Sequence, residues 1–294
     1  MTKIPNVAKY AFCESEDNFS FTKHSTVSCG GFAKKAFYPK TEEETARLIA
    51  LLQADGIPFH VLGCLSNVLP PNGNSSRVVV STKKLQEIRT TEKGIYAQAG
   101  VTGGALLRFC KEIGKSGVEF LQGIPCTLGG VLYMNAGVAD GHISDVVESV
   151  TILRVGRRLV LQKKDCGYGY KTSVFMQTND VILGAELCLT DATQAIVEEN
   201  CKRYAEKRAW LPKGKSMGCV FKNPQGAVAG KLIESAGLKG LRIGGAVISK
   251  THANFIINDN GAKSSDICAL IQIIKNAVFA QYKIRLEEEI RYLD

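Results

Sequence analysis

The chain of 294 residues contains no long apolar run. Its opening segment, MTKIPNVAKYAFCESEDNF, has no apolar stretch of signal-peptide length. No later segment approaches the roughly 18 to 20 apolar residues that a membrane-spanning helix needs. We therefore expect a cytoplasmic protein without a membrane partner. With 45% hydrophobic residues, a chain of this length is long enough for two domains, each with its own core.

Several cysteine, histidine and glycine motifs are also missing. The ten cysteines never form a CxxC pair, which is typical of reduced cytosolic thiols and not of a disulfide framework or a zinc site. The four histidines do not pair at metal-ligand spacing, so no metal site is expected. There is no GxGxxG after a strand and no GxxxxGK[ST], which argues against Rossmann and P-loop phosphate sites. GKSMG matches the GxSxG nucleophile elbow around Ser216, but that elbow needs a strand before it and a helix after it, and neither is indicated here.

The positive charge of the chain indicates an anionic partner. The formal net charge is +9, but lysine and arginine are spread along the chain and only 7% of the residues are aromatic. That distribution argues against a nucleic-acid partner. A phosphorylated small molecule or a nucleotide cofactor suits it better.

Short strand-like runs alternate with helical ones. Segment 40–56 predicts a helix, because Thr41 and Glu44 have capping-box spacing and Gly56 follows at the end. A second helix is predicted from about Ser265, with one apolar face that reads as a packing stripe formed by Ile267, Leu270, Ile271, Ile274 and Val278. Further helices are expected at 102–117, 191–210 and 228–237. Strands are expected at 57–63, 77–82, 94–100, 147–155, 181–190, 246–258 and near 287–293.

Two glycine-rich stretches, 63–73 and 123–141, lie near predicted strand ends. Glycine permits positive φ and lets backbone N–H groups approach a ligand, so such loops can hold a pyrophosphate. One stretch alone could be an ordinary tight turn. Two in a basic chain favour a nucleotide cofactor.

The order of several motifs is similar to that of a known family. The motifs are GGFAKKAFYPKTEEE, LGCLSNVLPP, GVEFLQGIPCTLGGVLYMNAGVADG, CGYGYKTSVF, GCVFKNPQGAVAGKLIESAG, THANFIIN and LEEEIR. From about residue 19 onward the chain resembles the MurB family, the UDP-N-acetylenolpyruvoylglucosamine reductases, and its length resembles the shorter form. The resemblance implies an α+β protein. Its FAD-binding domain, of the vanillyl-alcohol-oxidase type, would span 1–190 in subdomains of about 1–83 and 84–190, and a C-terminal α+β substrate-binding domain would span 191–294.

The resemblance also implies a reaction. In this family NADPH reduces bound FAD and leaves, and UDP-N-acetylglucosamine enolpyruvyl ether is then reduced to UDP-N-acetylmuramate for peptidoglycan. Hydride reaches the vinyl carbon, so the enzyme must stabilise enolate-like charge and protonate the adjacent carbon. We expect a cytoplasmic monomer that serves cell wall biogenesis, and hence cell shape and division.

Cofactor residues are carried over by position from the two family segments. They are Gly63, Cys64, Leu65, Ser66 and Asn67 in the first segment, and Gly123, Ile124, Pro125, Gly129, Gly130, Asn135, Ala136 and Gly137 in the second. The first family segment reads GGGSN, so Cys64 and Leu65 replace glycines. If one of those glycines needs positive φ, the loop must differ locally.

Three positions match the family's catalytic set. Glu289 takes the place of the carboxylic acid near the enolpyruvyl group, Lys171 stands where the motif GYRxS has arginine, and Cys219 stands where the proton-donating serine is usual. Without the family context they read as an edge-strand glutamate, a solvated lysine and a buried small residue. Lysine lacks the planar fork with which arginine binds a carboxylate, which leaves a looser site open.

A thiol can replace the serine as the acid. With a reference pKa of about 8.5 it is a stronger acid than an alcohol, but a lysine such as Lys171 or Lys222 could favour the thiolate, which cannot donate a proton. The rate should then fall as the pH rises through the thiol pKa.

Substrate contacts are implied in the same C-terminal region. Lys222 and Asn223 match diphosphate and sugar contacts, His252 matches a polar UDP contact, and Arg242 is a weaker candidate. Lys222 could also be a solvated strand residue and His252 a satisfied core residue. Three alternatives stay open for the chain as a whole: a same-fold flavin oxidoreductase for another nucleotide sugar, a catalytically impaired paralogue, and a binding protein without catalysis.

Overall fold

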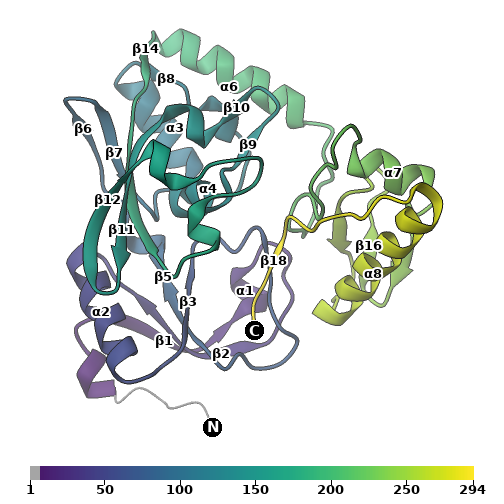
Figure 1. Ribbon diagram of the computed structural model, residues 1–294, viewed down its shortest axis with the longest axis horizontal. Coiled ribbons are helices and arrows are strands. Elements are labelled where there is room, and N and C mark those ends of the chain that lie inside the picture. Colours follow the sequence, from purple (N-terminus) through teal and green to yellow (C-terminus); the bar gives the residue numbers. More distant parts are fainter. Residues whose placement is uncertain (1–6) are drawn as a thin grey trace. The chain divides into compact units, whose positions relative to one another are not determined.

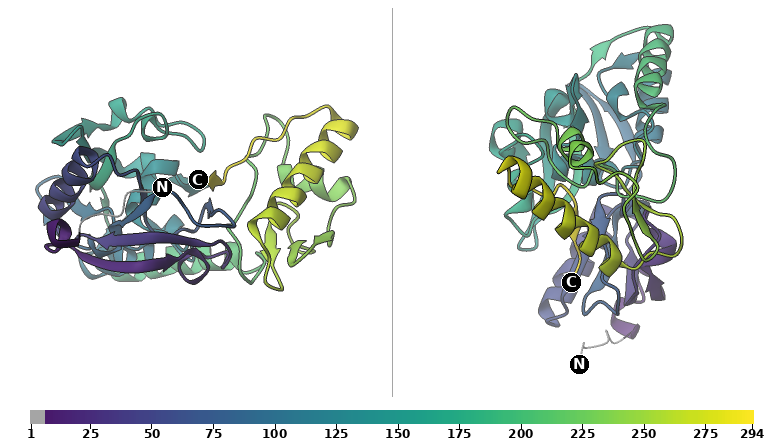
Figure 2. Two further views of the ribbon diagram at one scale, coloured as in Figure 1. Left: turned by 90° about the horizontal axis from the view of Figure 1, so that it is seen from below. Right: turned by 90° about the vertical axis from the view of Figure 1, so that its right-hand side faces the viewer.

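The computed structural model describes residues 7–294 and forms two compact units (Figures 1 and 2). Within the described residues, unit 1 comprises 7–16, 35–64 and 78–209, and unit 2 comprises 17–34, 65–77 and 210–294. Each unit therefore combines segments that are far apart in the sequence. The first glycine-rich loop is divided between them, since Cys64 is the last residue of one unit 1 segment and Leu65 begins a segment of unit 2.

A four-stranded sheet of order β1-β2-β5-β3 begins the fold, with β2, β5 and β3 parallel. Its strands are β1 (Glu14–Ser20), β2 (Phe32–Tyr38), β5 (Val78–Ser81) and β3 (Phe59–Leu62). Helix α2 (Glu42–Ala54) buries Leu48, Ile49 and Leu52 in a core shared with Phe37 and Val80 (Figure 1).

The predicted capping of α2 is confirmed in part. The Thr41 Oγ1 accepts from the Glu44 N–H at 3.0 Å, as the capping-box spacing predicts. The Glu44 carboxylate accepts from the N–H of Lys40 at 2.7 Å, one residue earlier than in the standard box.

A five-stranded antiparallel sheet of order β12-β11-β13-β7-β6 forms the rest of the framework of unit 1. Its strands are β6 (Ile88–Thr91), β7 (Gly94–Gln98), β11 (Val147–Arg154), β12 (Arg157–Gln162) and β13 (Val181–Leu187). A separate apolar cluster joins this sheet to nearby helices. The helices of this part are α3 (Gly103–Glu112), α4 (Leu128–Met134), α5 (Ile143–Val146) and α6 (Gln194–Arg208).

Two short ribbons complete unit 1. They pair β8 (Lys115–Ser116) with β14 (Thr190–Asp191), and β9 (Gly137–Val138) with β10 (Gly141–His142). Helix α4 and strand β9 lie inside 123–141, the stretch that the sequence presents only as glycine-rich, and β10 begins at its last residue. In this stretch unit 1 therefore has a helix and a short strand, although the glycine-rich composition indicates turns.

Unit 2 is built around α8 (Ser264–Tyr282), which packs against β15 (Arg242–Ile243) and β16 (Ala246–Ile248) (Figure 2). The predicted apolar stripe of α8 is confirmed, because all five of its residues are at most 3% exposed. The remaining elements are α1 (Phe21–His24), α7 (Ala229–Ser235), β17 (Ile256–Asn258) and the parallel pair β4 (Val68–Leu69) and β18 (Arg291–Tyr292). In residues 7–294 no helix is both long enough and apolar enough to cross a membrane.

The single strand predicted at 246–258 is wrong. The segment forms β16 and β17, which pair antiparallel with Val247 opposite Ile257. Between them the Ser249 Oγ accepts from the N–H groups of Thr251 and His252 at 3.1 and 3.2 Å. A serine that bonds its own backbone in this way favours a turn over a continued strand.

Candidate active site

The two predicted cofactor segments meet in unit 1 at Gly63 and Thr127. A Cβ added to Gly63, just after β3, would lie 2.1 Å from the Thr127 Oγ1. Only glycine therefore allows this approach without a shift of Thr127, which is the N-cap residue of α4. The contact joins positions that are far apart in the sequence.

Thr127 was not among the predicted site residues. It is 1% exposed, and its Oγ1 has no hydrogen-bond partner within residues 7–294. A buried hydroxyl without a partner is unfavourable, so the group is one that a ligand could satisfy. Its position in the sequence could have indicated it, because Thr127 lies between Pro125 and Gly129 of the predicted cofactor segment.

The glycines of the second segment have different roles. Gly123 has a φ of +75°, which favours glycine. A Cβ on Gly129 would lie 3.0 Å from the Ala99 Cβ, so this glycine permits close packing of α4. Gly130 is exposed, and a Cβ there would have only the Thr127 Oγ1 within 4 Å, at 3.7 Å. The first turn of α4 is therefore open beside Thr127.

Leu65 replaces a glycine of the family segment, and it nevertheless adopts the left-handed conformation that glycine favours. Its φ is +51° and the residue is 4% exposed. The left-handed conformation costs a residue with a Cβ about 1–2 kcal/mol. Burial of a leucine contributes about 1.5–3 kcal/mol, which offsets that cost. The substitution therefore does not prevent positive φ at this position.

The thiols near these segments remain protonated. Burial raises the pKa of Cys126 to about 12, and burial also raises the pKa of Cys64 above its ordinary value. Neither thiol therefore adds negative charge to these segments at neutral pH.

Lys171 lies beside the second cofactor segment. Its Nζ donates to the Gly137 carbonyl at 3.4 Å, and its own φ is +53°. The Asn135 Nδ2 donates to the Gly169 carbonyl at 2.8 Å, and the Asn135 Oδ1 accepts from the Ser144 N–H at 3.2 Å. Two hydrogen bonds therefore join the segment that contains Lys171 to the second cofactor segment, and both lie within unit 1.

Cys219 and Glu289 lie on neighbouring backbone segments of unit 2. Cys219 pairs with Phe255 in an antiparallel bridge, and the Val220 N–H donates to the Asn254 carbonyl at 2.8 Å. On the other side the Glu289 N–H donates to the Val220 carbonyl at 2.8 Å. The predicted acid and the predicted carboxylate are thus positioned by the same short set of paired backbone segments.

Asn67 of the first cofactor segment contacts Glu289. The Asn67 Nδ2 donates to the Glu289 carbonyl at 3.1 Å, and the Asn67 carbonyl accepts from the Arg291 N–H at 2.9 Å. These bonds continue the parallel pairing of β4 with β18. Three predicted site residues, Asn67, Cys219 and Glu289, therefore belong to one region of unit 2.

Asn254 fixes the backbone segment that carries Cys219. Its Oδ1 accepts from the Phe221 N–H at 2.9 Å and its Nδ2 donates to the Phe221 carbonyl at 2.8 Å, while its side chain is 3% exposed. The side-chain amide of Asn254 thus bonds both backbone groups of Phe221, as a residue of a neighbouring strand would do. The sequence motif THANF contains Asn254, but its role depends on a pairing that spacing does not reveal.

The N254A substitution should destabilise unit 2. It leaves two buried backbone groups of Phe221 without partners, so we expect the free energy of unfolding to fall by about 2–4 kcal/mol. Urea denaturation monitored by circular dichroism measures the loss. The matched control N276A changes an exposed asparagine of α8 and should stay within about 0.5 kcal/mol. Equal stability of the two variants would show that the Asn254 amide does not hold this backbone segment.

The predicted substrate residues also lie in unit 2. The Lys222 Nζ pairs with the Glu287 carboxylate at 2.5 Å, and its side chain is 18% exposed. The Asn223 Oδ1 accepts from the N–H of Ala229, the first residue of α7, at 3.0 Å. Arg242 pairs with Asp259. Each of these polar groups therefore already has a protein partner.

His252 is half-buried and accepts at Nδ1 from the Asn254 N–H at 3.1 Å. Burial lowers the pKa of His252 below its ordinary value, which favours the neutral ring at pH 7. Because Nδ1 is an acceptor here, Nε2 carries the proton of the neutral ring. A neutral ring with a donor at that nitrogen fits a polar contact to a nucleotide and adds no positive charge of its own.

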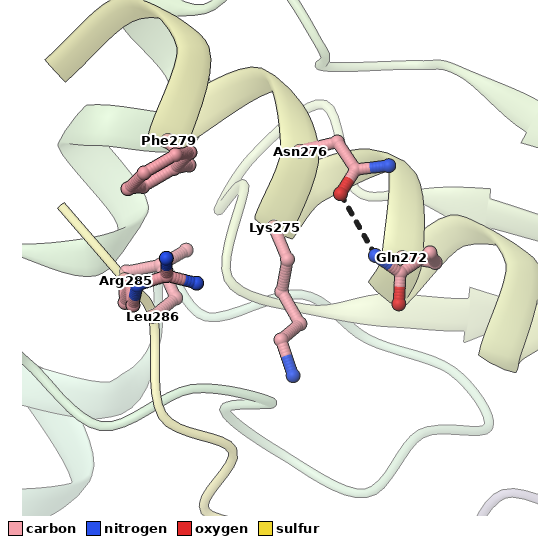
Figure 3. Close-up of a pocket in the computed structure, with 6 residues that line it drawn as sticks. All are labelled: Gln272, Lys275, Asn276, Phe279, Arg285 and Leu286. Carbon is pink, nitrogen blue, oxygen red and sulfur yellow. Dashed lines mark hydrogen bonds between the residues drawn. The ribbon is translucent and has the colours of Figure 1, made fainter. Parts of the chain in front are cut away.

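A hollow of about 310 Å³ lies beside α8 in unit 2 (Figure 3). Figure 3 shows it lined by Gln272, Lys275, Asn276, Phe279, Arg285 and Leu286, from α8 and the segment after it. The Arg285 guanidinium stacks on the Phe279 ring at 4.4 Å. None of the predicted site residues lines this hollow, although its Lys275 bonds Glu288, the residue before Glu289, at 2.7 Å.

Comparison with known proteins first defines the class. Residues 33–157 match a family described as an FAD binding domain, and residues 211–293 match the C-terminal domain of UDP-N-acetylenolpyruvoylglucosamine reductase. The chain is therefore a flavin-dependent enzyme with a second, reductase-type domain. It belongs to the UDP-N-acetylenolpyruvoylglucosamine reductase family, the MurB family.

Individual relatives support this assignment. The reductase of Exiguobacterium sibiricum is 35% identical over 94% of this chain and 92% of its own length. The reductase of Geobacter metallireducens is 36% identical over 92% and 90%. The crystal structure of the Thermus caldophilus reductase has a TM-score of 0.81 at 31% identity and covers 96% of this chain and 99% of its own. A solvent-stable cholesterol oxidase, 18% identical, shares the fold alone over 62% of this chain and 38% of its own, with a TM-score of 0.50.

These findings confirm the main predictions made from the sequence. The family resemblance is correct, and the length fits its shorter form. The α+β fold with an FAD-binding domain of the vanillyl-alcohol-oxidase type and a C-terminal reductase domain is also correct. The predicted activity, a flavin-dependent reductase of peptidoglycan precursor synthesis, is that of the family to which the chain belongs. The residue roles and the domain boundaries remain predictions.

Proposed function

We propose that this chain is a monomeric cytoplasmic enzyme that uses NADPH to reduce UDP-N-acetylglucosamine enolpyruvyl ether to UDP-N-acetylmuramate. The observation that carries the proposal is the meeting of the two cofactor segments at Gly63 and Thr127, with Lys171 bonded to the second segment. Family membership supplies the reaction. The substituted positions are compatible with it, since Leu65 adopts positive φ.

The residues of unit 1 fit an FAD group. Gly63 packs directly against Thr127 because it has no side chain, Gly130 is open at the start of α4, and the buried hydroxyl of Thr127 has no partner in residues 7–294. Backbone N–H groups in such loops can face a pyrophosphate. Bound FAD would supply the hydride-transfer chemistry that links NADPH to the enolpyruvyl carbon. The protein's own residues must then hold the substrate, stabilise its charge and supply a proton.

The T127V substitution tests the cofactor cradle. Valine keeps the shape but removes the orphan hydroxyl, so the apo-protein should unfold at equal or higher denaturant concentration. Loss of one hydrogen bond to the cofactor should weaken FAD binding about 3- to 10-fold, measured by flavin fluorescence titration. The T127S variant keeps the hydroxyl and should bind FAD as the parent does. Destabilised apo-protein with unchanged FAD affinity would mean that the hydroxyl serves only the fold.

Cys219 is the proton donor in this proposal. Its thiol is a stronger acid than the serine alcohol it replaces, so it can protonate the carbon next to the carboxylate. Lys171 contributes positive charge that stabilises the enolate-like carboxylate, but without the two-pronged geometry of arginine. Glu289 takes the role of the acid near the enolpyruvyl carboxylate, and its bonds to Val220 and Asn67 fix its backbone.

Lys222 and Asn223 are proposed to contact the diphosphate and the sugar. The exchange of the Glu287 carboxylate for a diphosphate would keep Lys222 in a charge-assisted hydrogen bond. His252 is proposed to face the nucleoside end of the substrate. Arg242, which pairs with Asp259, remains the weaker candidate.

NADPH oxidation by purified FAD-loaded protein tests the proposed function. We expect slow oxidation without the enolpyruvyl ether and rapid stoichiometric oxidation with it, together with formation of UDP-N-acetylmuramate. Reduction of the flavin by NADPH without reoxidation by that ether would contradict the proposal. That outcome would favour a same-fold oxidoreductase with another nucleotide sugar, or an impaired paralogue. Colourless protein that cannot be loaded with FAD would favour a binding protein without catalysis.

A further inference from the structure

Trp210 has an unusual position for the single tryptophan of the chain. It is 56% exposed, although tryptophan is a large apolar residue whose burial is strongly favourable. Its ring is nearly parallel to that of His252, with centroids 5.2 Å apart and planes 12° apart. One face of the indole is therefore supported by His252, and the side chain as a whole stays open to solvent.

The support under Trp210 is well fixed. The His252 ring lies 5.0 Å from the Phe255 ring, and a Cβ on Gly230 of α7 would lie 3.0 Å from the His252 Cε1. The His252 Nδ1 also accepts from the Asn254 N–H. Burial makes His252 a weaker base, so the ring that supports the indole is neutral at pH 7. A ring fixed on several sides holds its stacked partner at low conformational cost.

The aromatic stack connects to the predicted catalytic and diphosphate residues within unit 2. Phe255 is the bridge partner of Cys219. Asn223, the predicted diphosphate and sugar contact, bonds the N–H of Ala229, and the next residue of α7, Gly230, packs on His252. Asn223 and the stack therefore meet at the first two residues of α7. Lys239 and Glu234, which form an ion pair at 2.6 Å, both lie near enough to His252 to act on its protonation, and they act with opposite signs.

We infer that the indole of Trp210 is the stacking platform for the uracil base of the UDP-sugar. A planar base fits a third layer on the stack of His252 and Trp210, since base–aromatic stacking needs only an open aromatic face. In a UDP-sugar the base and the reacting carbon lie at opposite ends, separated by ribose and diphosphate. From His252 the contacts lead through Phe255 to Cys219 and through the start of α7 to Asn223, so residues suited to the base, the diphosphate and the reacting carbon belong to one connected set in unit 2. The inference rests on the proposed substrate and assigns its nucleoside end.

Tryptophan fluorescence of the FAD-loaded protein tests the platform directly, because Trp210 is the only tryptophan. Titration with UDP should quench or shift its emission saturably, whereas pyrophosphate at the same concentrations should not. In calorimetric titrations W210A should bind UDP about 5- to 150-fold more weakly than the parent. W210F, which keeps an aromatic face, should restore most of the affinity. F279A changes another partly exposed aromatic of unit 2 and should bind UDP as the parent does.

Steady-state kinetics separate this inference from the proposed function. W210A should raise the KM for the enolpyruvyl ether by the same factor, with kcat and the rate of flavin reduction by NADPH unchanged. A UDP affinity of W210A within twofold of the parent would overturn the platform, as would tighter Trp210-dependent binding of ADP than of UDP. Failure of the parent enzyme to reduce the ether would overturn the proposed function. The UDP titration would still test whether uracil stacks on Trp210.

Discussion

Replacement of Cys219 by alanine should lower substrate-driven flavin reoxidation by about 10²- to 10⁴-fold, the usual contribution of a positioned general acid. Alanine removes the proton but keeps the small size of the side chain. The reduction of the flavin by NADPH should be unchanged, because it needs no proton from this position. Anaerobic stopped-flow absorbance at the flavin band measures the two half-reactions separately.

Two further variants sharpen the Cys219 test. C219S restores a proton donor of the type usual in the family and should recover most of the lost rate. C268A removes an exposed thiol of α8 in the same unit and should leave both half-reactions unchanged. If C219A reoxidises at the parental rate, the proton comes from another group or from water, and Cys219 is only a packing residue.

Replacement of Lys171 by methionine should slow the same half-reaction by about 10²- to 10³-fold, as expected for the loss of one charged group that stabilises the transition state. Methionine keeps the length of the side chain but removes the charge. Single-turnover reoxidation of the reduced enzyme by saturating enolpyruvyl ether gives the rate. The effect should be on this rate and smaller on the KM, because the enolate-like charge develops only during the reaction.

The K171R variant distinguishes charge from shape. Arginine restores the planar fork usual at this position and should match or exceed the parental rate. K164M removes an exposed lysine of the same unit and serves as the control. Parental reoxidation by K171M would mean that Lys171 only ties its loop to the Gly137 carbonyl.

The elements that a local sequence pattern marks were predicted, and those without such a pattern were missed. Helices α2 and α8 were predictable because a capping box and a continuous apolar stripe mark them locally. β1 was not predicted, since ESEDNFS is mostly polar and shows no alternation of buried and exposed positions. α4 was missed because two glycines occupy its first turn. The turn between β16 and β17 depends on bonds from Ser249 that propensity does not register.

The candidate site shows the same limit. The family resemblance located Cys219, Lys171 and Glu289, because their motifs lie in order along the chain. It did not locate Thr127 or Asn254, whose importance rests on one orphan hydroxyl and on two bonds to the Phe221 backbone. The positive φ of Leu65 also could not be read from sequence, because a buried leucine there is favourable only through tertiary packing.

The pH dependence of substrate-driven flavin reoxidation tests most directly whether the Cys219 thiol donates the proton. A thiol donates only while it is protonated, so the parental rate should be constant near pH 6 and fall as the pH rises through the thiol pKa, ordinarily about 8.5. C219S, whose alcohol does not ionise in this range, should show no such fall. A parental rate that stays constant from pH 6 to about 9.5, or an identical fall in C219S, would contradict the assignment of Cys219 as the acid.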